Sequence, residues 1–265
     1  MLQDPVDEAR NIIKTAGERK ITLRLIGGIA FRIRCPSTAR ETLSRHYADI
    51  DFVGMRKQRK SVDELFVGCG YAPRTTFNAL SGGIRLIYND FEHQRRADIF
   101  LDIFEMSHKL DFSARLGIDD VTLPLADLLL TKLQVHEFTE KEHKDVIALL
   151  LDAAQGESDG LNIVNMKYVA EQCARDWGLY RTVTLNLDKV KSSASSYLPE
   201  PGEQQTLNSS ITRARERIEA EPKTMGWKMR ARLGDRKQWY EVPESDQEVV
   251  DSRSISERKA PSSTN

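Results

Sequence analysis

The chain has 265 residues, of which 40% are hydrophobic, and it carries 39 Lys and Arg against 40 Asp and Glu. This length is enough for one large domain or two modest ones with hydrophobic cores. The formal net charge of -1 gives no overall electrostatic reason to expect a nucleic-acid or membrane partner, so any basic patch must be local. The longest aliphatic run, residues 146–151, is far shorter than the ~20 residues that a membrane span needs.

The three cysteines, Cys35, Cys69 and Cys173, lie far apart and have no metal-ligand spacing. Their odd number leaves at least one unpaired, which is typical of a reducing compartment. The first twenty residues are charged throughout and lack an apolar signal core. We therefore expect a cytoplasmic protein with no membrane partner.

Strands and helices are expected to alternate through residue 104. Residues 5–19 place apolar side chains at helical spacing, and residues 22–26 are strand-like and end at Gly27 and Gly28. Beyond them the pattern predicts helices at 29–34 and 57–67 and strands around 50–53, at 84–88 and at 97–104.

From residue 122 onward the pattern is helical. One helix is expected to open at Thr122 and Pro124 and to include LADLLLTKLQVHEF (125–138). Thr139 with Glu142 forms a capping box for a second helix that ends near Ala154. Residues 155–160, QGESDG, have the composition of a linker. Two further helices are expected at 166–178 and 204–220, with a soft segment before the second.

These elements predict an α+β fold, in which a mixed β-sheet with flanking helices is followed by an α-helical C-terminal region. We place the first domain at residues 1–155 and a helical domain at residues 160–240. Residues 241–265 have few apolar side chains and many Ser, Glu and Pro, which predicts a disordered tail.

Gly27 and Gly28 follow the first strand directly. Such a pair lets the backbone turn tightly and brings bare N–H groups close to a phosphate at a helix start. An ordinary turn is the other interpretation of the pair.

Asp49 and Asp51 lie two apart on a predicted strand, so both carboxylates point to the same face about 6 to 7 Å apart. They would repel each other unless a cation lies between them, and hard oxygen ligands of this kind suit Mg²⁺. The alternative is an exposed polar face on an edge strand. Asp98 and Asp102 share one parity on the later strand, whose other residues favour burial.

Together, the segments IGGIAF (26–31), RHYADIDF (45–52) and RRADIFLDIF (95–104) resemble the nucleotidyltransferases of the DNA polymerase beta superfamily. The resemblance implies that Asp49 and Asp51 hold two divalent ions, Mg²⁺ or Mn²⁺, on a nucleoside triphosphate. It also implies a third carboxylate that binds one ion and activates the acceptor hydroxyl. We assign this role to Asp98, with Asp102 as the alternative.

A closer similarity is to the nucleotidyltransferase toxins of abortive-infection systems. It rests on Arg45 before the aspartate pair, on Lys132 in LLTKL and on Asp145 in KDVIAL, and it covers about residues 20–152. The resemblance implies phosphate binding by Arg45 and Lys132 and a role for Asp145 in positioning or deprotonating the acceptor. The alternative for Lys132 and Asp145 is an interhelical ion pair.

The expected activity is transfer of a nucleoside monophosphate (NMP) from a nucleoside triphosphate (NTP) to a hydroxyl of RNA, a small molecule or a protein. Gly27 and Gly28 would hold the triphosphate.

Residues 205–240 carry nine Lys or Arg against four Asp or Glu, with interleaved Trp and Tyr, which favours RNA slightly as the acceptor. A core role for Trp227 and Trp239 is the other interpretation. An antitoxin-like protein partner is expected from the toxin resemblance, and a catalytically silent nucleotide- or partner-binding module on the same fold remains the alternative function.

Overall fold

A computed structural model, described here for residues 1–242, has an α+β architecture built on a mixed five-stranded sheet. The strand order is β1-β2-β5-β4-β3, with β2 and β5 parallel and every other neighbouring pair antiparallel. The α+β class is thus confirmed. The strands are β1 (Leu23–Ile26), β2 (Asp49–Gly54), β3 (Ala72–Pro73), β4 (Arg85–Asp90) and β5 (Arg95–Leu101).

The alternation of residues in β2 separates the two faces of the sheet. Ile50 and Phe52 are fully buried, whereas Asp49 and Asp51 on the opposite face are only partly buried. Phe66 packs against Phe52 and Tyr88, with ring centroids 5.5 and 4.9 Å apart, and so fixes a helix below the sheet. The aspartates are therefore left facing the other side.

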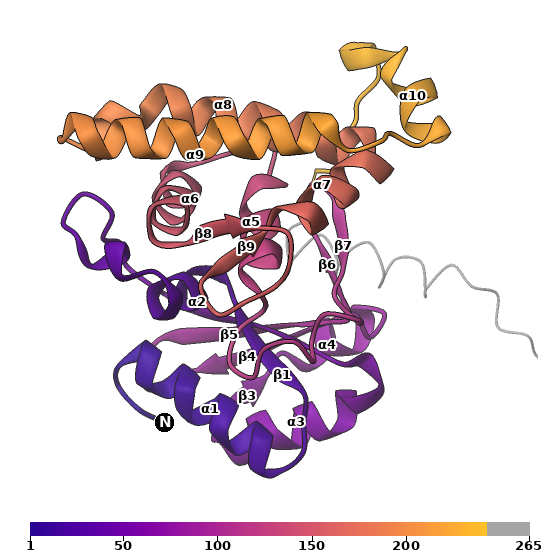
Figure 1. The fold of residues 1–265 in the computed structure, drawn as a ribbon. Helices are drawn as coiled ribbons and strands as arrows, with labels where there is room; N and C mark the ends of the chain where they lie inside the picture. Colours follow the sequence, from indigo (N-terminus) through magenta and orange to yellow (C-terminus); the bar gives the residue numbers. More distant parts are fainter. Residues whose placement is uncertain (243–265) are drawn as a thin grey trace, which may run out of the picture.

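Helices lie on both sides of this sheet (Figure 1). Below it are α1 (Pro5–Glu18) and α3 (Arg59–Gly68), and above it are α2 (Gly27–Arg34), α5 (Leu125–Leu133) and α6 (Glu140–Asp152). The shorter elements are the 3-10 turns η1 (Pro36–Ala39), η2 (Arg56–Gln58) and η3 (Gly234–Arg236), the helix α4 (Thr75–Leu80) and the hairpin of β6 (Ile103–Glu105) with β7 (Lys109–Asp111).

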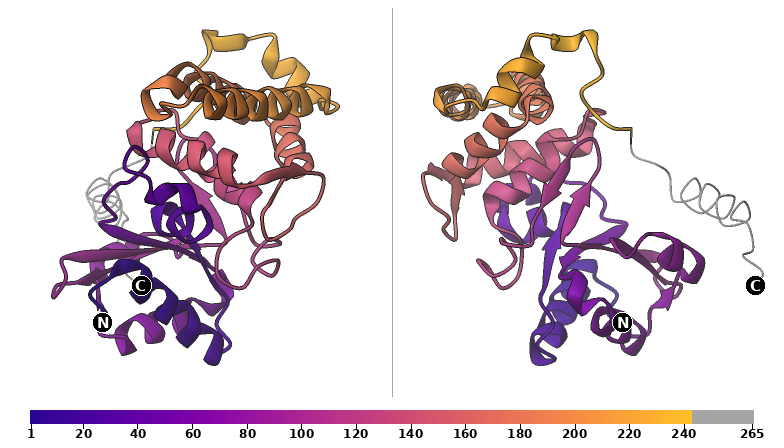
Figure 2. Two further views of the ribbon diagram at one scale, coloured as in Figure 1. Left: turned by 60° about the vertical axis from the view of Figure 1, so that its left-hand side comes forward. Right: turned by 90° about the vertical axis from the view of Figure 1, so that its right-hand side faces the viewer.

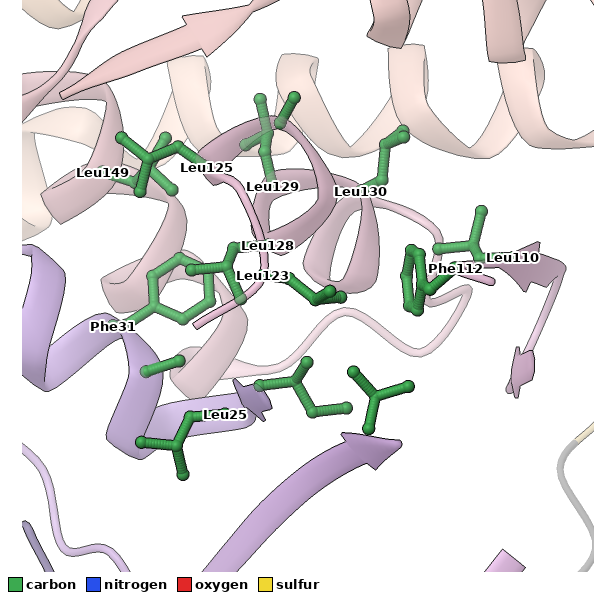
Figure 3. Packing of buried hydrophobic residues seen from close by; sticks show 14 of the residues in the cluster. Leu25, Phe31, Leu110, Phe112, Leu123, Leu125, Leu128, Leu129, Leu130 and Leu149 are labelled. Carbon is green, nitrogen blue, oxygen red and sulfur yellow. The ribbon is translucent and has the colours of Figure 1, made fainter. Parts of the chain in front are cut away.

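Helix α5 lies at the centre of the hydrophobic core (Figure 3). Its residues Leu128, Leu129 and Leu130 are fully buried although they point in different directions, because the helix is surrounded on all sides. Around them, as Figure 3 shows, pack Phe31 from α2 and Leu149 from α6. A helix so enclosed gives its one basic residue, Lys132, a fixed position.

The capping box expected before α6 is present, because the Glu142 carboxylate accepts the backbone N–H of Thr139 at 3.1 Å. The first two residues of the expected linker at 155–160 belong instead to a small parallel sheet, and the remaining residues connect its two strands. Its strands are β8 (Ala154–Gly156) and β9 (Ile163–Asn165). The pairing gives the backbone of this polar stretch hydrogen-bond partners that its composition does not reveal. The division into domains of residues 1–155 and 160–240 stays a prediction.

The C-terminal helices are α7 (Met166–Arg175), α8 (Trp177–Tyr197), α9 (Pro201–Ala220) and α10 (Met225–Ala231). Helices α8 and α9 lie side by side above α5 and α6 (Figures 1 and 2). The predicted helix 166–178 is wrong at its end, because Asp176 is extended and its carboxylate accepts the N–H groups of Gly178 and Leu179, which starts α8. The predicted disordered tail at residues 241–265 lies almost wholly outside the described residues.

Arg115 joins the stretch after β8 to the core. Its guanidinium is bound to Asp127 of α5 and to Asp159, with Nη2 to carboxylate oxygen distances of 2.8 and 2.7 Å. It also lies 4.0 Å from the ring centre of Tyr168 in α7. Asp127 is fully buried, and this burial raises the pKa of its carboxyl to about 6 even beside Arg115.

Replacing Arg115 by methionine should destabilise the protein by about 3 to 5 kcal/mol, because a buried carboxylate would lose its counter-charge. Urea unfolding followed by circular dichroism measures the change. Arg181→Met is the matched control, since Arg181 makes the same two-point contact with Asp235 at an exposed site. An equal loss in both variants would contradict this explanation.

Candidate active site

Asp51 and Asp98 stand opposite each other on the parallel strands β2 and β5. Neighbouring strands are about 4.8 Å apart, and paired residues point to the same face, so the two carboxylates lie side by side. Asp98 is only 2% exposed and Asp51 is partly buried. Two carboxylates thus share one pocket, but they come from different strands.

The pairing changes the acidity of Asp51. Burial, and after it the negative charge of Asp98, raises the pKa of the Asp51 carboxyl to about 7, which Lys132 only partly offsets. A carboxyl that resists ionisation beside a second carboxylate is a common feature of functional sites. It also means that a cation between the two would stabilise both charges.

Asp49, the other member of the predicted pair, points to the same face nearer the start of β2. Its side chain is 44% exposed, and its nearest cation is Arg96, whose Nη2 lies 3.9 Å from Oδ2. The same Arg96 nitrogen lies 3.7 Å from Asp98. A guanidinium therefore lies between Asp49 and the inner carboxylate.

Asp102, the alternative third carboxylate, does not join this group, and the expectation that it faces the same way as Asp98 is wrong. Strand β5 ends at Leu101, and Asp102 has a left-handed φ of 63° that breaks the strand's alternation. Its carboxylate accepts the backbone N–H of Arg56 at 3.2 Å, at the opposite end of β2 from Asp49. Asp102 thus caps a turn.

Gly27 and Gly28 bring the start of α2 against the side chains of the site. A Cβ added to Gly27, which has a φ of 63°, would lie 2.8 Å from Cγ of Asp51. A Cβ on Gly28 would lie 2.8 Å from Cζ of Arg45. A side chain at Gly27 would be strained by the left-handed φ as well as by this contact, and one at Gly28 would require the Arg45 side chain to move.

Arg45, Lys132 and Asp145 meet above α2. The Arg45 guanidinium donates to both oxygens of Asp145, at 3.1 and 2.7 Å. Lys132 of α5 lies 3.0 Å from Asp145 and 3.5 Å from Glu142, both on α6. The structure therefore shows the interhelical ion pair that was the alternative for Lys132 and Asp145, extended by Arg45. Since both Asp145 oxygens already accept from a cation, this geometry favours positioning over proton transfer.

Arg85 was not expected from the sequence pattern, and the structure brings it to the centre of the site. Its Nε lies 2.9 Å from Oδ1 of Asp98, and its Nη2 lies 2.5 Å from Oδ2. Arg85 begins β4, the neighbour of β5. The one signal for it is a basic residue within the otherwise apolar strand stretch IRLIY (84–88).

These side chains line a cavity of about 200 Å³ between the sheet and α5. Its charged lining consists of three cations and three carboxylates, and an apolar side is formed by Ile26, Phe100, Phe104, Met106 and Val135. The charged residues are Asp51, Arg85, Arg96, Asp98, Lys132 and Glu142, beside Gly27. Arg45, Asp49 and Asp145 lie next to this lining rather than in it.

The carboxylates present fit one hard divalent cation. Among residues 1–242 no three or more His, Cys, Asp and Glu side chains gather in a way that could hold a metal ion. Mg²⁺, however, is typically bound by only one or two carboxylates and completes its shell with water and substrate phosphates. Asp51 and Asp98 meet that requirement, whereas the two-ion arrangement with Asp49 has no such support.

The aromatic residues of segment 205–240 are packed into the fold. Trp227 contacts Tyr180, with ring centres 5.1 Å apart, and Trp239 donates its Nε1 proton to Thr182 at 3.1 Å. Both tryptophans are only partly buried and lie outside the hydrophobic core of the described residues, so they pack at its edge and the core role is not confirmed. The exposed charges of the segment include Lys228, Arg232, Arg236 and Lys237. RNA binding through these cations stays a prediction.

No protein-family model and no curated protein matches the chain. Within the part of the chain that the structure describes, no helix combines the length and apolar character needed to cross a membrane. The assignment to the nucleotidyltransferases therefore remains a resemblance carried by the residues of the site.

Asp51→Asn should stabilise the protein without added metal by on the order of 2 kcal/mol at pH 8. The raised pKa means that the native state holds a proton that the unfolded state releases, so stability falls as pH rises from about 4 to about 7. The gain from the substitution should shrink toward pH 5. Thermal unfolding in EDTA across this range tests it, and a gain independent of pH would contradict the assigned cause.

Proposed function

We propose that this protein is a metal-dependent nucleotidyltransferase that moves an NMP from an NTP to an acceptor hydroxyl. The observation that carries the proposal is the side-by-side placement of Asp51 and Asp98 in a cavity that Gly27 and Lys132 also line. Two adjacent carboxylates and a glycine turn at a helix start suit metal-bound phosphate chemistry.

The triphosphate would lie between α2 and α5. Ile26 caps α2 without any side-chain hydrogen bond, so the first N–H groups of the helix have no competing side-chain acceptor at the cap. Lys132 faces the same cavity from α5. In this proposal the backbone of Gly27 and Gly28 and the Lys132 ammonium bind the phosphates, and Arg45 holds Lys132's partner Asp145 in place.

Asp51 and Asp98 would hold the cation, Mg²⁺ or Mn²⁺, which when bound supplies positive charge against the phosphates. The acceptor oxygen would form a new bond to the α-phosphorus while the α–β phosphoanhydride bond breaks and pyrophosphate leaves. The acceptor's proton would pass to the Asp98 carboxylate. The apolar wall of the cavity, which includes Phe104 and Met106, would exclude water from the reacting phosphate.

Replacement of Asp51 or Asp98 by asparagine should reduce transfer at least about a hundredfold, because each variant loses a cation ligand or proton acceptor. The assay offers each of the four α-labelled triphosphates with Mg²⁺ to total RNA, cell protein and an aminoglycoside mixture. Label in one fraction identifies the acceptor class.

Asp102→Asn is the matched control for this assay. Asn tolerates the left-handed backbone and can still accept the Arg56 N–H, so it should keep the activity of the unaltered protein. Undiminished transfer by Asp51→Asn would refute the proposed site.

Lys132→Met should weaken binding of a triphosphate by about tenfold, the effect of losing one phosphate contact worth about 1.4 kcal/mol. Asp145 would keep its two bonds from Arg45, so the fold should persist. Fluorescence titration with a labelled triphosphate measures the affinity. Lys141→Met provides the control, since Lys141 is an exposed residue of α6 and does not line the cavity. Equal affinities for both variants would remove Lys132 from the phosphate site.

A catalytically silent nucleotide- or partner-binding module is the second candidate. The observation that favours it is the two-point pairing of Asp98 with Arg85, which occupies the carboxylate that catalysis requires. A protein that binds a triphosphate yet labels no fraction would support this candidate. We also propose RNA as the acceptor, bound through residues 205–240, which label in the RNA fraction would support. An antitoxin-like protein partner, sought in the cell-protein fraction, is a separate proposal.

A further inference from the structure

Arg85 occupies the position where a cation would neutralise Asp98. Its Nε and Nη2 contact the two oxygens of one carboxylate, at 2.9 and 2.5 Å. The Asp98 side chain is only 2% exposed, so solvent contributes little to balancing its charge. A planar guanidinium that donates to both oxygens makes the strongest side-chain contact that can neutralise a buried carboxylate.

The Arg85 guanidinium is also held by aromatic rings. Its Cζ lies 5.6 Å from the centre of the Phe77 ring in α4 and 5.1 Å from that of Phe100 in β5. Both rings are buried, with Phe77 2% and Phe100 6% exposed. These contacts favour the cation at this position. The pairing is therefore a built part of the site and not a chance surface contact.

A divalent cation at Asp98 would stand within a few ångströms of the guanidinium. Two positive charges at that distance repel each other strongly in a partly buried cavity. We infer that the Arg85 guanidinium competes with the divalent cation for Asp98 and releases this carboxylate only when a phosphate group arrives to bind the guanidinium. This inference rests on the proposed function, since it takes the cation site from there.

A triphosphate resolves the competition because it offers the guanidinium a better-matched partner. Arg binds phosphate with the same two-point geometry as carboxylate, and Arg85 lines the same cavity as Gly27 and Lys132. One or both bonds to Asp98 would then pass to phosphate oxygens, and the freed carboxylate oxygen would bind the cation. Cation and nucleotide should thus bind together, and the cation alone only weakly.

The test measures Mn²⁺ binding to the full chain by electron paramagnetic resonance, with no acceptor and no turnover. Without nucleotide, Arg85→Met should bind Mn²⁺ at least about tenfold more tightly than the unaltered protein, because one nearby positive charge is removed. Arg85→Lys, which keeps the charge but loses the two-point contact, should fall between them and guards against a folding defect. A triphosphate should tighten Mn²⁺ binding to the unaltered protein far more than to Arg85→Met.

Arg74→Met is the matched control, because Arg74 stacks on the same Phe77 ring at 5.7 Å but does not line the cavity. It should leave Mn²⁺ binding unchanged. If Arg85→Met binds Mn²⁺ no more tightly while Asp51→Asn abolishes binding, the inference fails and the cation site stands. If none of the proteins binds Mn²⁺ even with a triphosphate, the cation site of the proposed function fails and the inference with it.

Discussion

The parallel pairing of β2 with β5 sets the register in which Asp51 stands opposite Asp98. A shift of one residue would turn one of these carboxylates into the hydrophobic layer against α3, where Ile50 and Ile99 lie. The burial of Ile50 and Phe52 in β2 and of Ala97 and Ile99 in β5 within this layer therefore fixes the acidic pair together with the core. Everything proposed for the site depends on this register, because no loop brings the two carboxylates together.

Bringing two carboxylates together creates a charge that the surrounding elements must balance. Arg85 from β4 and Arg96 from β5 contact Asp98, and Lys132 from α5 reduces the effect of burial on Asp51. The cations thus come from the sheet on one side and from a helix on the other. Because these cations already contact the carboxylates, a metal ion entering the site would have to displace existing contacts.

Helix α5 connects the site to the rest of the chain. Its leucines are enclosed by the side chains of neighbouring elements (Figure 3). The helix contributes Lys132 to the cavity and Asp127 to the buried contact with Arg115. The C-terminal helices therefore act on the site through packing, since none of their residues lines the cavity. Their structural role accounts for Trp227 and Trp239, whose rings pack against other aromatic residues.

The sequence by itself determined the α+β class, the strands and helices around the site, and the facing of Asp49 and Asp51, because alternation and helical spacing are local properties. The sequence also offered two interpretations of Lys132 and Asp145. One was an interhelical ion pair, and the other was phosphate binding by Lys132 with an acceptor role for Asp145. Only the tertiary structure decided that Asp98 is the carboxylate beside Asp51, that Asp102 leaves the strand through a left-handed turn, and that Arg85 reaches Asp98. These outcomes depend on strand order and register between residues far apart in the chain, which no local pattern specifies.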